Sequence, residues 1–352
     1  MKVLYVKNGH STFIRLDEEI LSAHFPTRSL YLNNTGRYIY FFELIKLVIF
    51  LVLLMPFHTI AYTRFADWHA AIMAWFCRLY GKKFAVVVGG YDATHFPEFK
   101  YGVYDRRQRG KWARYALRNA NMVLPNNPTL IGYINHYMPG ISRLGGIKHF
   151  VPEMRGEIRV VYNGYHTGFW VPAPEKKIPG RVMTVAYVGN HRNYLMKGVD
   201  DFILAARSMP ELTFQLVGVT TEKLEEWAGK LPGNLHVAGS LNRAELLTEY
   251  QRTSVFCLLS LSEGMPNVLC EAMLCECVPV VSDVNYNARL VADCGIIIRE
   301  KDPVLIVEAI RKAIRSGREK GKMARQAIVE NYPFERREKA LVEIIRELAG
   351  KT

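Results

Sequence analysis

The feature that most constrains this chain is an alternation of short apolar strands with amphipathic helices, which runs twice along the sequence. The first run contains strand-like segments such as KVLYV (2–6) and TIAYT (59–63), with the helical TFIRLDEEILSAHF (12–25) between them. The second run begins with the strand VMTVAYVGN (182–190) and the helix KGVDDFILAARSM (197–209). Alternation of this kind is typical of parallel sheets covered by helices on both faces. The sequence therefore predicts an α/β protein with two doubly wound, Rossmann-like domains.

The 352 residues are too many for one ordinary hydrophobic core and fit two domains. We expect a first domain over residues 1–164 and a second over 181–330. The segment Tyr165–Gly180 is rich in proline and glycine and is interpreted as the linker. Residues 331–352 form a C-terminal helix, for which packing back on the first domain is one arrangement. Ligands of such sheets bind outside the carboxyl ends of the strands, so we expect a site in a central cleft that the two domains face.

The net charge of +13 is concentrated in the first half of the chain. Residues 1–165 carry a net +11, whereas residues 166–352 carry +2. The densest run, Lys100–Arg118, has seven positive residues and one aspartate. It is either a solvated helix face or a surface for an anionic partner, such as phospholipid, nucleic acid or a phosphorylated substrate.

The apolar segment Tyr38–Phe57 is nearly long enough to span a bilayer. Glu43 and Lys46 lie inside it, however, at a spacing that allows an ion pair on a helix. A span here would also cut the first domain in two. We therefore favour an unusually apolar helix that is buried or lies against a membrane surface. With the charge pattern, this predicts a cytoplasmic protein, peripheral on the cytosolic face of the membrane.

Six cysteines occur without a C-x-x-C pair or a histidine at zinc spacing, so we expect buried free thiols, a reducing compartment and no metal site.

The stretch SLSEGMPNVLCEAML (260–274) holds two glutamates in an apolar context. It follows a predicted strand, and Pro266 fits the first turn of a helix. Gly264 allows close approach of a ligand, and the free N–H groups of the helix start suit a phosphate or diphosphate. The bland alternative is that Glu263 caps the helix and Glu271 faces solvent. On spacing alone the two interpretations are equal.

The segment EGMPNVLCE (263–271) resembles the Glu-x7-Glu motif of retaining glycosyltransferases with the GT-B fold, notably family 4, the glycosyl transferases group 1. VVYNGYHTGFWVP (160–172) and VAYVGNHRNYLMKGVDDFILAA (185–206) are similar to further segments of that family. The resemblance is strong over residues 158–345 and weaker over 1–157. It implies a GT-B fold with a nucleotide-sugar donor, UDP- or GDP-linked, and no cofactor.

The resemblance also implies roles for single residues. Arg192 and Lys197 would bind the donor diphosphate, Glu271 the ribose hydroxyls, and Glu263 would face the transferred sugar. Backbone N–H groups from Gly264 to Asn267 would hold sugar and phosphate oxygens. The complete donor set implied is Gly189, Arg192, Lys197, Val219, Gly239, Leu241, Glu263, Gly264, Met265, Pro266, Asn267 and Glu271. No metal is implied.

The implied acceptor-side residues are Gly9, Gly90, Tyr91, Asp92 and Asn163. Asp92 stands where many members have a histidine, so the resemblance places it near the reacting sugar, while the alternative is a cap on the turn after Gly89-Gly90. The catalytic set implied is then Asp92, Glu263, Arg192 and Lys197. Two further departures are His166 in the Asn-Gly-x-Asp segment and an offset of one residue at Arg192.

The function implied is transfer of a sugar, with retention, from a nucleotide sugar to a hydroxyl of a glycan or lipid-linked acceptor, in the synthesis of cell-surface polysaccharide or glycolipid. The alternatives are a nucleotide-sugar epimerase or phosphorylase on the same fold, and a basic nucleic-acid-binding protein. No nucleic-acid partner is expected, because the donor stretch disfavours the last alternative. A dinucleotide oxidoreductase is disfavoured because no G-x-G-x-x-G follows the first strand.

Overall fold

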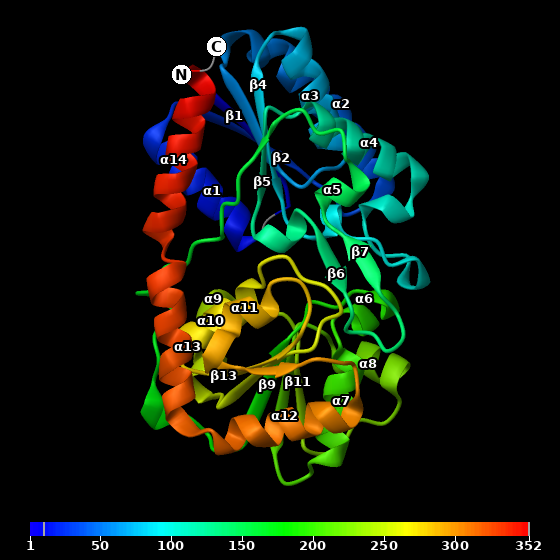
Figure 1. Ribbon diagram of the computed structural model, residues 1–352, viewed down its shortest axis with the longest axis vertical. Helices are drawn as coiled ribbons and strands as arrows, with labels where there is room; N and C mark the ends of the chain where they lie inside the picture. The colour runs from blue at the N-terminus through cyan, green and yellow to red at the C-terminus, as the bar shows by residue number, and fades with distance from the viewer. Residues whose placement is uncertain (10, 351–352) are drawn as a thin grey trace. The chain divides into compact units, whose positions relative to one another are not determined.

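The computed structural model describes residues 1–9 and 11–350, which divide into two compact units (Figure 1). The first unit comprises Met1–Tyr133, Leu144–Gly164 and the C-terminal segment from Glu335. The second comprises Ile134–Arg143 and Tyr165–Phe334. Neither unit is therefore a single continuous stretch of the chain.

The first unit is built on a six-stranded parallel sheet in the order β2-β1-β3-β4-β5-β8. Its strands are β1 (Val3–Asn8), β2 (Thr27–Leu32), β3 (Ile60–Arg64), β4 (Lys83–Val88), β5 (Met122–Pro125) and β8 (Glu157–Ile158). Its helices are α1 (Thr12–His24), α2 (Arg37–Leu54), α3 (Trp68–Leu79), α4 (Arg107–Asn119), α5 (Ile147–Phe150) and α14 (Phe334–Gly350). This order is that of a doubly wound sheet, as the alternation of strands and helices predicts.

The helices of the first unit cover both faces of its sheet. Helices α2, α3 and α4 share one hydrophobic cluster with the strands, which includes Leu47, Met73 and Ala113. Helices α1 and α14 lie on the other face (Figure 1). This placement of α2, α3 and α4 on one side is the one expected when parallel strands are connected by right-handed crossovers.

A buried ionic cluster joins α1, β3 and α14 within the first unit. The carboxylate of Asp17 accepts hydrogen bonds from Arg64 Nε at 2.5 Å, from Arg337 Nε at 2.8 Å and from the Tyr62 hydroxyl at 2.6 Å. Asp17, Arg64 and Arg337 are all at most 2% exposed. Burial by itself would raise the pKa of Asp17, but the two arginines lower it to about 2.

The second unit is a six-stranded parallel sheet in the order β11-β10-β9-β12-β13-β14. Its strands are β9 (Arg181–Val185), β10 (Thr213–Val217), β11 (Leu235–Ala238), β12 (Val255–Leu258), β13 (Val278–Ser282) and β14 (Ile296–Ile298). Its helices are α6 (His191–Met196), α7 (Val199–Ser208), α8 (Thr221–Ala228), α9 (Arg243–Arg252), α10 (Asn267–Leu274), α11 (Asn287–Val291), α12 (Pro303–Arg315) and α13 (Gly317–Asn331). A separate two-stranded sheet pairs β6 (Tyr133–Asn135) with β7 (Arg143–Gly145).

The segment interpreted from the sequence as a linker, Tyr165–Gly180, is part of the second compact unit. Trp170 within it is 2% exposed and packs edge-on against Tyr250. Lys177 Nζ donates to the carbonyl oxygens of Thr253 and Cys275 at 2.5 and 2.8 Å. Proline and glycine give this segment an irregular backbone, but a buried tryptophan and a well-bonded lysine fix it to the unit.

All six cysteines are buried free thiols, as the sequence predicts. Burial raises the pKa of Cys270 to about 12, which keeps this thiol protonated. These residues therefore act as small apolar side chains of the core.

Candidate donor site in the second unit

The donor-side residues predicted from the sequence follow the strands of the second sheet. Gly189 comes after β9, Val219 after β10, Gly239 after β11 and Glu263 after β12. Because these strands are parallel neighbours, their carboxyl ends lie along one edge of the sheet. The structure thus brings the predicted donor residues to the edge where open α/β sheets bind ligands.

Glu263 forms an ion pair with Lys197, whose Nζ lies 2.6 Å from Glu263 Oε1. The Glu263 side chain is 12% exposed and that of Lys197 is 33% exposed. Helix α10 has no side-chain cap, so Glu263 does not cap it. The alternative in which Glu263 caps the helix is therefore wrong.

A close backbone contact places Lys197 beside the end of β12. Gly198 adopts a left-handed conformation with φ of 63°, and a Cβ there would lie 2.1 Å from the carbonyl oxygen of Leu259. The N–H of Leu261 donates to the carbonyl of Met196 at 2.9 Å. Only glycine permits this approach, so the Lys-Gly pair brings the ammonium group to the carboxylate.

Two asparagines that the sequence did not single out hold the loop that carries Glu263. Asn135 Nδ2 donates to the carbonyl of Leu261 at 2.8 Å, and Asn135 is 6% exposed. The N–H of Glu263 donates to Asn285 Oδ1 at 3.0 Å. Asn135 lies far away in sequence, and Asn285 has a left-handed φ of 47°, so neither belongs to a motif that spacing reveals.

Helix α10 begins at Asn267, one residue later than predicted, because Pro266 is in an extended conformation with ψ of 104° and occupies the N-cap. Pro266 has no N–H group, but at the start of a helix this group would have no partner within the helix, so no hydrogen bond is lost. Asn267 Oδ1 accepts a hydrogen bond from the Tyr165 hydroxyl at 2.9 Å. The Met265 side chain is buried and helps to fix the loop. Contact between the Met265 backbone and a ligand stays a prediction.

Glu271 is 7% exposed and does not face solvent, so that interpretation is also wrong. The Tyr250 hydroxyl reaches its carboxylate over 3.5 Å, the limit of a hydrogen bond. Burial raises the pKa of Glu271 to about 8, although Arg243 and the Tyr250 hydroxyl act in the opposite direction. A buried carboxylate with one long hydrogen bond among the described residues suits a ligand that brings hydroxyl donors.

The remaining donor residues occupy loops and short helices of the same edge. Arg192 lies half-buried in α6, and its Nε donates to Asn193 Oδ1 at 3.4 Å. Gly189 and Gly239 have open space where a Cβ would be, and Leu241 is half-buried nearby in sequence. Their contacts with a nucleotide stay predictions.

Asp92, in the first unit, is 1% exposed, and three backbone N–H groups donate to its carboxylate. The donors are Gly89 at 2.9 Å, Gly90 at 3.0 Å and Ala66 at 3.0 Å. Burial raises its pKa in spite of these bonds. Asp92 thus stabilises the turn after β4, which favours the turn-cap alternative; contact with a reacting sugar stays a prediction.

The other acceptor-side residues also belong to the first unit. Gly9 and Gly90 have positive φ angles of 120° and 130° and mark turns after β1 and β4. Tyr91 lies beneath the Arg109 guanidinium, and Asn163 accepts from Arg64 Nη2 at 3.3 Å. Asn163 is therefore tied to the buried Asp17 cluster.

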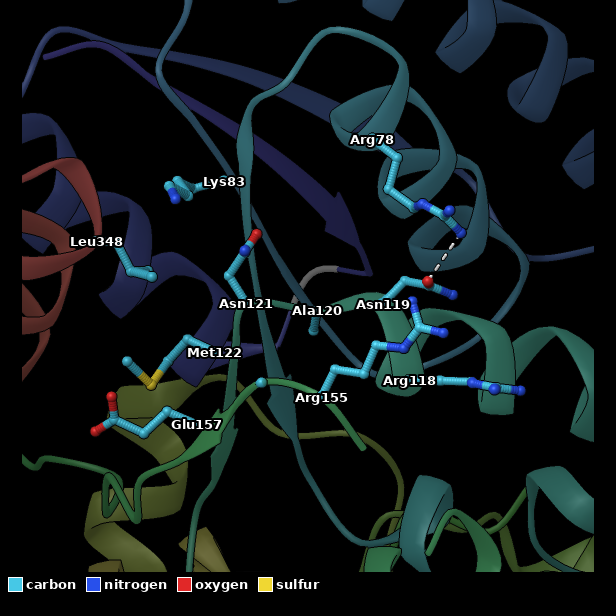
Figure 2. A pocket seen from close by; sticks show the side chains of 11 residues that line it. Arg78, Lys83, Arg118, Asn119, Ala120, Asn121, Met122, Arg155, Glu157 and Leu348 are labelled. Atoms are coloured by element: carbon cyan, nitrogen blue, oxygen red, sulfur yellow. Dashed lines mark hydrogen bonds between the residues drawn. The ribbon is translucent and has the colours of Figure 1, made fainter. Parts of the chain in front are cut away.

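The first unit also has a pocket of about 390 Å³, and none of these acceptor-side residues lines it (Figure 2). Its lining includes Lys83, Met122 and Glu157, which are the first residues of β4, β5 and β8. The pocket is thus at the amino edge of the sheet, opposite the edge where such folds bind substrates. Among residues 1–9 and 11–350, no group of three His, Cys, Asp or Glu side chains has the arrangement of a metal site.

The fold is that of GT-B glycosyltransferases. Sucrose-phosphate synthase from Thermosynechococcus elongatus has a TM-score of 0.77 at 14% identity, with both chains covered in full. Anabaena HepE in complex with UDP-glucose has a TM-score of 0.71 at 15% identity, over 99% of this chain and 100% of that one. A trehalose-6-phosphate synthase, described for glycosyl transfer with retention, has a TM-score of 0.70 at 12% identity, over 99% of each chain.

Residues 161–330 match the family model of the glycosyl transferases group 1. The matched segment contains the Lys197–Glu263 pair and Glu271. A comparison with curated proteins gives no match. Fold and family match together support a glycosyltransferase.

Proposed function

We propose that this protein is a retaining glycosyltransferase of family 4 that moves a sugar from a UDP- or GDP-linked donor to a hydroxyl of a glycan or lipid-linked acceptor. The observation that carries the proposal is the Lys197–Glu263 pair at the end of β12, in the same segment as the buried carboxylate of Glu271. Anabaena HepE, which shares the fold, has a structure in complex with UDP-glucose. A nucleotide sugar offers a diphosphate to Lys197 and ribose hydroxyls to Glu271.

The proposed chemistry uses charges already placed in the second unit. Lys197 and Arg192 stabilise the negative charge that develops on the departing nucleoside diphosphate. The N–H groups at the start of α10 add to this field. Glu263 faces the transferred sugar. When the diphosphate binds, the Glu263 carboxylate loses its ion pair with Lys197 and accepts hydrogen bonds from hydroxyl groups of the donor. These positive groups do the work for which other transferases use a metal ion.

The donor proposal is tested by a thermal-shift panel of nucleoside diphosphates and nucleotide sugars. A ligand that binds the folded state raises the melting temperature by mass action, so one nucleotide series should stand out. A panel in which no nucleotide shifts the protein would remove the donor-site assignment. Assays with candidate acceptors, followed by NMR of the anomeric configuration of the product, then test retention.

A second experiment separates a transferase from the two related functions. An epimerase converts the donor into an epimer without any acceptor, and a phosphorylase needs inorganic phosphate to release the sugar 1-phosphate. Product analysis with and without acceptor therefore decides between them and a transferase. We further propose that the protein acts at the cytosolic face of a membrane in the synthesis of surface polysaccharide or glycolipid, because its first unit is basic and exposes apolar side chains.

A further inference from the structure

Helix α2 exposes an apolar face that runs along most of its length. The exposed side chains are Tyr38, Ile39, Phe41, Phe42, Ile45, Val48, Ile49, Val52 and Leu53, and Phe57 follows in the next turn. Phe42 is 67% and Ile49 is 55% exposed, well above what a solvated helix of a globular protein shows for such residues. A contiguous apolar patch of this kind marks an interaction surface.

The opposite face of α2 is fixed to the protein. Leu47 and Leu51 of α2, and Met55 directly after the helix, are fully buried in the cluster that α2 shares with α3 and the sheet. The helix is long and apolar enough to cross a membrane by composition, but lipid cannot surround it while this stripe is packed. Lys46 and Glu43 form an ion pair at 2.5 Å on the helix, which also suits an interface rather than a bilayer centre.

The same layer of helices carries a basic surface on α4. Helix α4 and its N-cap expose Arg106, Arg107, Lys111, Arg114 and Arg118, and the helix contains no acidic residue. Trp112, also on α4, is 38% exposed and packs against Trp68 of α3 at 6.1 Å between ring centroids. Between α2 and α4, helix α3 exposes Trp75 and Leu79 at 51% and 61%. Exposed tryptophans beside cationic groups are typical of proteins at a membrane interface.

Two hollows continue this basic surface. One, of about 340 Å³, lies beside α4 and is lined by Lys111, Trp112 and Arg114 among others. In the other, Figure 2 shows Arg118 and Arg155 close to Asn119, to which Arg78 donates at 3.0 Å. Arg118 lines both hollows and forms an ion pair with Glu153 at 3.0 Å, so the unpaired positive charge of this surface lies mainly toward the start of α4.

We propose that α2 lies in the plane of an anionic lipid leaflet, with its apolar face among the acyl chains and the basic side chains of α4 against the phosphate headgroups. The apolar face and the cationic face belong to one layer of helices. Together they match the acyl chains and the phosphate groups of an anionic bilayer, whereas a purely apolar partner would match only the first face. The inference rests on the proposed function for its biological sense, because a lipid-linked acceptor lies in a bilayer. The binding itself needs no sugar transfer.

The test is flotation of the full chain with vesicles made of equal parts phosphatidylglycerol and phosphatidylcholine, compared with pure phosphatidylcholine. We expect binding to the anionic vesicles that decreases as salt is raised. Replacing Arg106, Arg107 and Lys111 by Gln should lower the partition coefficient roughly a hundredfold, at about fivefold for each charge. Replacing Phe42, Ile45 and Ile49 by Asn should lower it by more than about tenfold on both vesicle types.

Matched controls come from exposed residues of the second unit. Lys223, Lys230 and Lys312 changed to Gln remove as many charges, and Leu204, Val304 and Met323 changed to Asn remove as many apolar side chains. Both control variants should bind vesicles like the unchanged protein. Every variant is also melted with and without the nucleotide that binds best, which shows whether it is folded.

Three results would overturn the inference. The first is no flotation of the folded protein with anionic vesicles, and the second is flotation that the α2 and α4 variants leave unchanged. The third is a dimer that the α2 variant converts into a monomer, without vesicle binding, since a second copy would then cover the face. If the protein binds vesicles but no nucleotide shifts its melting temperature, the donor proposal fails and this inference stands. If a nucleotide shifts the melting temperature but the protein does not bind vesicles, the donor proposal stands and this inference fails.

Discussion

Lys197 Nζ and Glu263 Oε1 lie 2.6 Å apart, although 66 residues separate them in the chain. The pair joins the C-terminal end of α6 to the loop after β12. Each partner neutralises the other, so neither charge is buried alone. Under the proposed function, a donor diphosphate would give Lys197 a stronger anionic partner and would release Glu263 toward the sugar.

The first prediction separates these two residues. Lys197→Met should weaken binding of the preferred nucleoside diphosphate by about tenfold or more, because a charge-assisted bond is lost. Glu263→Gln should change nucleotide affinity by less than about threefold but lower the transfer rate by on the order of 10²–10³. Isothermal titration and initial-rate assays measure the two effects, with Lys223→Met as a control for loss of a surface charge. Equal loss of affinity in both variants would contradict the separate roles.

The second prediction concerns pH and Glu271. Its pKa is about 8 in the folded protein, against 4.5 ordinarily, so the folded state binds the extra proton between these values. Its contribution to the free energy of unfolding therefore falls as pH rises through this window, by about 1.4 kcal/mol per pH unit at most. Glu271→Gln should melt at a higher temperature than the unchanged protein at pH 8, and the difference should shrink toward pH 5. A difference that is independent of pH would show that the carboxyl is ionised throughout.

The same variant should bind nucleotide more weakly above pH 8, where Glu271 is ionised, because an amide accepts fewer hydrogen bonds from the ribose than a carboxylate does. Greater stability with weaker binding is the combined signature of a residue kept for a ligand.

The third prediction concerns the backbone contact at Gly198. Gly198→Ala must accommodate a Cβ against the Leu259 carbonyl and a positive φ, so it should lower the free energy of unfolding by roughly 1–3 kcal/mol and reduce transfer. Gly233→Ala, where nothing lies within 4 Å of the added Cβ, serves as the control and should change stability by less than about 0.5 kcal/mol. Denaturant titration measures both. Similar values for the two variants would mean that the loop moves freely.

The fourth prediction concerns the Asp17 cluster. Arg337→Met should lower the free energy of unfolding of the first unit by about 3–5 kcal/mol, because it removes one partner of a buried carboxylate. Lys339→Met, on the exposed side of the same helix, should have an effect within about 0.5 kcal/mol. Adding Asp17→Asn to Arg337→Met should cost less than the sum of the single changes, as residues of one network are coupled.

The pKa of Asp17, about 2 when folded against 3.8 ordinarily, fixes the sign of its pH dependence. Its stabilising contribution is present above the ordinary pKa and is lost as pH falls through the folded value. Acid unfolding followed by circular dichroism should therefore begin at higher pH in Arg337→Met. An unchanged acid limb would show that another carboxylate controls it.

What the sequence predicts well here is local. The strands and helices, the Glu263 and Glu271 spacing and the Lys-Gly pair all follow from periodicity or from a resemblance within a short segment. The structure corrects Pro266 by one residue, because an extended ψ and a helical one are equally open to proline. It also shows that Glu271 is buried, which spacing on a short helix could not decide.

What escapes the sequence is long-range. Asn135 reaches the loop of Glu263 from more than a hundred residues away, and Arg337 reaches Asp17 from the far end of the chain. A lone asparagine or an arginine on an amphipathic helix carries no signal of its partner. The linker shows the same limit, since the burial of Trp170 depends on Tyr250 rather than on the neighbouring prolines.

The last helix has a consequence for how the protein is made. Arg337 on α14 completes the pairing of Asp17. The first unit therefore begins at the N-terminus but has all its segments only after α14 is synthesised. The second unit, by contrast, has all its segments once Phe334 is synthesised. During translation the first unit therefore lacks α14, and Asp17 lacks its partner Arg337, until the segments of the second unit have been synthesised. A chain truncated before α14 should lose the half of the molecule that was synthesised earliest.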